Sequence, residues 1–144
     1  MKSVIERLET IPTLKQRVHG AAKLSDLTER GSIAANGTAA FVLPLGLRGG
    51  AADAATGMYR QSLDRLVGVV LVVRNQGDAT GAKAVIELDV LIEAVIQLLA
   101  GWGPEEDVFG VLTVARGELV SIDKGTITYQ LDFAIEHQLR IVRP

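Results

Sequence analysis

Two short groups of side chains have types and spacing that could do chemistry. Residues 46–50 read Gly-Leu-Arg-Gly-Gly, a glycine-rich run of the kind that can bind phosphate. The run lacks the G-x-x-x-x-G-K-S/T spacing and no helix start follows it closely, so it does not indicate a nucleotide site. Glu105, Glu106 and Asp107 are consecutive acids that could chelate a cation. Acid-base work requires burial or a charge partner, which this turn-like context does not indicate.

The remaining reactive residue types are equally uninformative. His19 and His137 are the only histidines, and neither has a second ligand at the i+2 or i+4 spacing of a familiar metal site. His137 falls on the apolar positions of an alternating strand, where a hydrogen-bonded core or interface histidine is the usual case. There is no cysteine, and no serine stands in a G-x-S-x-G context. We therefore predict no catalytic residue, no metal and no cofactor.

The bulk composition bounds the class of protein. A chain of 144 residues without a Pro/Gly/Ser linker predicts one domain, residues 1–144. With 48% hydrophobic residues and a net charge of -2, the chain is too apolar for disorder and is not a basic nucleic-acid binder. The absence of cysteine fits a reducing compartment, and the charged start differs from a signal peptide. We expect synthesis in the cytoplasm and no membrane partner.

Charge is divided along the chain. Residues 1–76 hold ten Lys or Arg against six acids, a sum of +4, and residues 77–144 hold five against eleven, a sum of -6. One interpretation is an ordinary solvated surface. The other is a polar subunit that docks head to tail on copies of itself.

The most regular stretch is residues 126–141, which alternate apolar and polar without a break. A period of two predicts a β-strand with one dry and one wet face. At about 3.3 Å per residue such a strand spans on the order of 50 Å, so it is bent or projects beyond its own domain. Its open backbone groups would be available to a neighbour, which points toward assembly.

The other elements follow from shorter patterns. Ser3 and Glu6 form a capping box for a helix over about residues 3–11, and Asp78 or Thr80 can cap a second helix that ends near Ala100. That second helix has apolar residues at helical spacing: Val85, Leu88, Leu91, Ile92, Val95, Leu98 and Leu99. Strands are predicted at about residues 39–47, 59–75 and 126–141, and strand candidates at 109–115 and 118–122 are separated by a bulge or tight turn at Arg116-Gly117. A weak element is predicted at 15–21 and one helical turn at 25–30. The prediction is an α+β fold, order α-(β)-β-β-α-β-β, with a mostly antiparallel sheet packed by helices on one face.

Between the first two strands, a flexible loop is predicted at about residues 46–58, because glycine and alanine offer little apolar area and much backbone freedom. Its basic, partly apolar tip could contact a partner or pass near DNA phosphates. The alternative is a loop with solvated charges. The partner-binding candidates are Arg48, Gly49, Gly50, Asp53, Met58 and Arg60.

Several runs in order resemble one known family. They are residues 40–46 (AFVLPLG), 69–75 (VVLVVRN) followed by Asp78 and Gly81, 99–104 (LAGWGP), 117–119 (GEL) and Asp132-Phe133. Together they resemble the tail terminator, or tail completion, proteins of long-tailed bacteriophages, especially those of Mu-like phages and prophages. The part before about Gly37 matches least.

The resemblance implies a small α+β subunit in a hexameric ring on the tail tube, which stops tube growth and joins the filled head. The implied partners are copies of the chain, the tail tube protein and a head-tail connector or head completion protein, with genomic DNA passing through the lumen without specific binding. In such a virion protein we expect Glu105, Glu106 and Asp107 at the channel or an interface. The alternatives are another neck protein, such as a head completion or connector subunit, and a small α+β binding module or enzyme.

Overall fold

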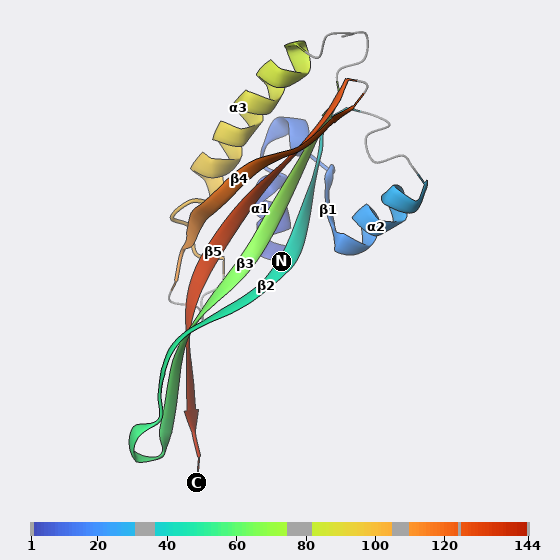
Figure 1. Ribbon diagram of the computed structural model, residues 1–144. Helices are drawn as coiled ribbons and strands as arrows, with labels where there is room; N and C mark the ends of the chain where they lie inside the picture. The colour runs from blue at the N-terminus through green and yellow to red at the C-terminus, as the bar shows by residue number, and fades with distance from the viewer. Residues whose placement is uncertain (1, 31–36, 75–81, 105–109, 124, 144) are drawn as a thin grey trace.

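The computed structural model describes residues 2–30, 37–74, 82–104, 110–123 and 125–143. The elements in chain order are α1 (Lys2–Leu8), η1 (Pro12–Leu14), β1 (Val18–Gly20), α2 (Ala21–Arg30), β2 (Ala39–Asp53), η2 (Ala55–Gly57), β3 (Met58–Arg74), α3 (Ala82–Leu99), β4 (Leu112–Asp123) and β5 (Thr126–Val142). This arrangement confirms the predicted α+β class with a mostly antiparallel sheet (Figure 1). The candidate helix caps Asp78 and Thr80 lie outside the described residues.

The five-stranded sheet has the order β1-β2-β3-β5-β4. Only β1 pairs in parallel, with β2 over three residues, whereas β2-β3, β3-β5 and β5-β4 are antiparallel. At the centre, β3 pairs with β5 in unbroken register from Met58↔Val142 to Arg74↔Thr126. The alternation of β5 specifies this register, because a slip by one residue would turn every side chain to the opposite face.

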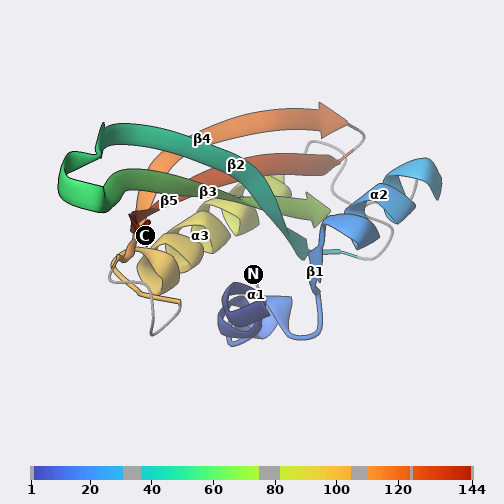
Figure 2. The same ribbon diagram turned by 90° about the horizontal axis from the view of Figure 1, so that it is seen from below.

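Helices α1 and α3 lie on one face of the sheet (Figure 2). Helix α3 buries Ala84, Leu88, Leu91, Val95 and Leu99, at spacings of four and three, against apolar residues of β3 and β5. Val85 was expected on this buried stripe but is 53% exposed, because it stands one position away from Ala84. The main core therefore lies between α3, α1 and the central strands.

Helix α2 departs from the one-faced arrangement. The sequence predicted one turn at residues 25–30, but the helix has ten residues and packs Leu24 and Leu27 against Phe41, Val70 and Val72. These three strand residues have the opposite parity to the main core, so α2 covers a smaller cluster on the other face. Local sequence could not show this helix because Ser25, Asp26 and Thr28 are weak helix formers.

The expected loop over residues 46–58 is mostly strand. Strand β2 continues to Asp53, the turn η2 follows, and β3 begins at Met58. Glycine and alanine favour strands weakly, but the neighbouring β3 offers a regular row of backbone partners that decides the structure. Register shifts between Pro44 and Gly46 and between Gly49 and Ala52 absorb the irregular residues. Whether this segment is mobile in the free subunit stays a prediction.

Beyond the helices, three strands continue as a projection that we call the arm, residues 46–66 and 136–143 (Figure 1). Strand β4 meets β5 only as far as Leu112↔Ile135, so the arm contains β2, β3 and β5 alone. At its tip the backbone N–H of Arg143 donates to the carbonyl oxygen of Gly57, 3.2 Å away. The C-terminal strand is thus tied to the hairpin tip.

Candidate interaction surface

The arm has two chemically different sides, because side chains alternate along each strand. Register places Leu47, Tyr59, Leu63, Leu139 and Ile141 on the side that continues the helix-covered face, together with Gln61, Arg65 and His137. None of these five apolar side chains belongs to either hydrophobic cluster of the described residues. Leu47 is 61% exposed, and the other four are partly exposed. This side, which we call the apolar side of the arm, is suited to contact with another protein.

The opposite side of the arm is charged and hydrogen-bonded within itself. Arg48 and Asp64 face each other across β2 and β3, and the Arg48 Nη2 donates to Asp64 Oδ2 at 2.9 Å. Ser62 Oγ donates to Glu136 Oε1 at 3.1 Å, across β3 and β5. These exposed bonds hold the strands in register and contribute little each, about 0.2–1 kcal/mol for a cross-strand pair.

Four of the predicted partner-binding residues lie on this charged side. Register puts Arg48, Asp53, Met58 and Arg60 on the same side, since Asp53 pairs with Arg60. Arg60 Nε donates to Met58 Sδ at 3.2 Å. Asp53 Oδ1 accepts a hydrogen bond from the Ala55 N–H at 3.1 Å, at the residue where the turn η2 begins. Their binding to a partner stays a prediction.

Gly49 and Gly50 allow the two hairpin strands to approach closely. A Cβ at Gly49 would lie 2.9 Å from Gln61 Nε2, and one at Gly50 would lie 3.1 Å from the backbone oxygen of Ser62. Gln61 Nε2 also donates to the Gly50 carbonyl oxygen at 3.3 Å. Their observed role is therefore to fit the irregular register of β2.

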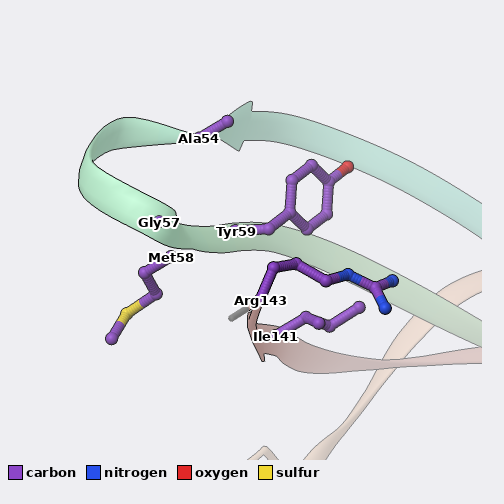
Figure 3. Close-up of a pocket in the computed structure, with 6 residues that line it drawn as sticks. All are labelled: Ala54, Gly57, Met58, Tyr59, Ile141 and Arg143. Carbon is purple, nitrogen blue, oxygen red and sulfur yellow. The ribbon is translucent and has the colours of Figure 1, made fainter.

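The tip of the arm carries a hollow of about 370 Å³, drawn in Figure 3. It is lined by Ala54, Gly57, Met58, Tyr59, Ile141 and Arg143. Met58 points away from Tyr59, as alternation along β3 requires (Figure 3). The Tyr59 hydroxyl has a hydrogen-bond partner within the arm, because it donates to Gln61 Oε1 at 2.7 Å. With mostly apolar walls and no convergent polar groups among these residues, the hollow is suited to docking rather than to catalysis.

A second exposed apolar surface lies at the end of the molecule away from the arm's tip, where α3 begins and β4 ends (Figure 1). Its members, which we call the α3–β4 patch, are Val85, Leu119 and Ile122, between 49% and 62% exposed. The exposed Ile86 and Val90 lie on the side of α3 away from its buried stripe and are not part of the patch. Register puts Leu119 and Ile122 on the face that α3 packs against. Exposed apolar side chains that gather in one place commonly mark an interaction site.

The sequence did not identify these two apolar surfaces. The available signal for the arm was the strand over residues 126–141, whose apolar alternation continues past the point that helices cover. For α3, the signal was apolar residues on more than one side of the helix. The acidic run Glu105, Glu106 and Asp107 lies outside the described residues, so its place at a channel or interface stays a prediction.

The histidines occupy separate parts of the fold. His19 lies in β1 with its ring against Phe41, at 5.7 Å between ring centroids, and His137 lies in the arm. Burial, and then the charge of Lys23, lower the pKa of His19 below its usual value. Among the described residues, no three His, Asp or Glu side chains come together as a metal site.

Comparison with known proteins gives the family. No helix in the described parts of the chain is long and apolar enough to cross a membrane. A search of curated proteins returned no match. The family model described as phage tail terminator protein matches residues 1–144, the whole chain. A small α+β subunit with two exposed apolar surfaces agrees with that match, and the chain belongs to the phage tail terminator protein family.

Proposed function

We propose that this structural phage tail protein forms a hexameric ring that caps the tail tube at its head-proximal end. The ring would end tail polymerisation and provide the surface that joins the head. Family membership over residues 1–144 supports a role in the tail. The observation that carries the ring is the arm, because a subunit with an exposed apolar side on a projecting sheet lowers its free energy by burying that side in an assembly.

The proposed partners are other copies of the chain, the tail tube protein and a head completion or connector protein. DNA would pass through the lumen without specific binding, since a net charge of -2 gives phosphates little overall attraction. No catalytic step belongs to this role. We also propose that residues 46–58 are mobile in the free subunit and become ordered when partners bind, because few apolar side chains hold them.

Deleting the gene from the phage or prophage that encodes it tests the function. Electron microscopy should then show tails of irregular and excessive length that carry no heads. Supplying the wild-type protein should restore length and joining. Normal tails joined to heads in the deletion strain would refute the proposal.

A shortened variant tests the arm within the same assay. Leu47 and Arg65 pair across the hairpin. Replacing residues 48–64 with Asn-Gly should therefore join β2 to β3 through a two-residue hairpin turn. The variant should fold, as circular dichroism would verify, yet fail to restore normal tail length and the joining of heads. The Gly20→Ala variant is the control, because a Cβ at Gly20 meets nothing within 4 Å. Recovery of the protein on tailless heads instead of headless tails would favour a head completion or connector role.

A further inference from the structure

We infer that the apolar side of the arm of one copy docks on the α3–β4 patch of the next copy, head to tail around the ring. The inference rests on the proposed ring and goes further by naming its two surfaces. One is Leu47, Tyr59, Leu63, Leu139 and Ile141, and the other is Val85, Leu119 and Ile122.

The two surfaces have matching chemistry. Both consist of exposed or partly exposed aliphatic side chains, and the arm adds one aromatic residue, Tyr59, a type enriched at protein interfaces. The apolar side of the arm and, in the patch, Leu119 and Ile122 both continue the sheet face that carries the main core. The interface would therefore extend an apolar face that is already covered at its centre by α3.

Charge argues for a second copy as the occupant. The arm holds Arg48, Arg60, Arg65, Arg140 and Arg143 against Asp53, Asp64 and Glu136, which gives 5 - 3 = +2. Residues 83–93 and 116–123, around the patch, hold Lys83 and Arg116 against Glu87, Asp89, Glu93, Glu118 and Asp123, which gives 2 - 5 = -3. Opposite signs steer the arm of one copy toward the patch of another, whereas two arms repel.

The positions of the surfaces agree with head-to-tail association. The arm's tip and the patch lie toward opposite ends of the subunit (Figure 1). Different surfaces at opposite ends make a heterologous interface, which repeats from copy to copy and closes when the rotation allows. The arm extends seven residues past Ile135 along β5, about 23 Å at the usual rise per residue, far enough to cross a subunit boundary.

Photo-cross-linking on assembled tails tests this docking. A benzophenone amino acid replaces Leu139 on the apolar side of the arm, and in a matched control it replaces Gln138, whose side chain points to the charged side. Both positions are at least partly exposed, so both variants should fold, as circular dichroism would verify. Tails carrying each variant are irradiated, and adducts are mapped by mass spectrometry.

The expected product from position 139 is a two-chain adduct whose cross-link maps to residues 83–93 or 116–123 of another copy. That adduct should be lost when the probe moves to position 138. An adduct of position 139 with the tube or a neck protein, equal adducts from both positions, or no adduct between copies overturns the inference. Each of these results would leave the ring standing, whereas absence of the wild-type protein from tails would refute the ring itself.

Discussion

Strand β5 passes through two different environments, the helix-covered half of the sheet and the arm. In the covered half it buries Ile127, Leu131, Phe133 and Ile135, whereas in the arm Leu139 and Ile141 remain partly exposed at the same parity. Helix length explains the difference. The 18 residues of α3 span about 27 Å, whereas the 17 residues of β5 span about 56 Å.

The comparison shows that alternation alone does not make a core. A buried stripe requires both a period of two and an element long enough to cover it. Where coverage ends, the same pattern leaves an apolar surface that is available to a partner. The two halves of one strand therefore have different tasks, the first in folding and the second in assembly.

Equal substitutions in the two halves should have very unequal effects. Leu131→Ala should lower the free energy of unfolding by about 2–5 kcal/mol, because Leu131 is buried and its loss leaves a cavity. Leu139→Ala, eight positions along the same strand face, should cost about 1 kcal/mol or less in the free subunit, because Leu139 is already partly exposed. Urea denaturation measures both changes. Equal losses would mean that the arm is part of the folding core.

The junction between the halves should be sensitive to a single methyl group. Gly110 lies against the backbone of Glu136, and a Cβ at Gly110 would overlap the Glu136 carbonyl oxygen. Gly110→Ala should therefore destabilise the protein by about 1–3 kcal/mol, because backbone must move. Gly20→Ala is the control, and it should be neutral or stabilise by up to about 1 kcal/mol. Thermal unfolding compares the two, and a tolerated Gly110→Ala would contradict this packing.

The smallest effect concerns how the arm holds itself together. A double-mutant cycle with Arg48→Ala and Asp64→Ala should give a coupling free energy of about 0.2–1 kcal/mol, because the Arg48 side chain is 66% exposed. The coupling should shrink in high salt, which screens exposed charges. A large coupling that is insensitive to salt would show that the charged side is buried in an interface.

Local pattern was sufficient for the elements with strong periodicity. The strand predicted over residues 126–141 is β5, and the apolar run after Tyr59 is β3. Helix α3 also followed from its spacing, apart from the position of Val85. In each case the residue order carries the signal, because burial on one side repeats at the period of the element.

The sequence by itself determined the α+β class, the order of the elements apart from α2, the resemblance to tail terminators and the length of β5. Tertiary structure alone decided that residues 46–53 form a strand, that α2 covers the second face and that helix coverage ends near Ile135. These features depend on pairing between residues far apart in the chain. Gly49 and Gly50 favour no strand locally, and only the backbone partners offered by β3 place them in one.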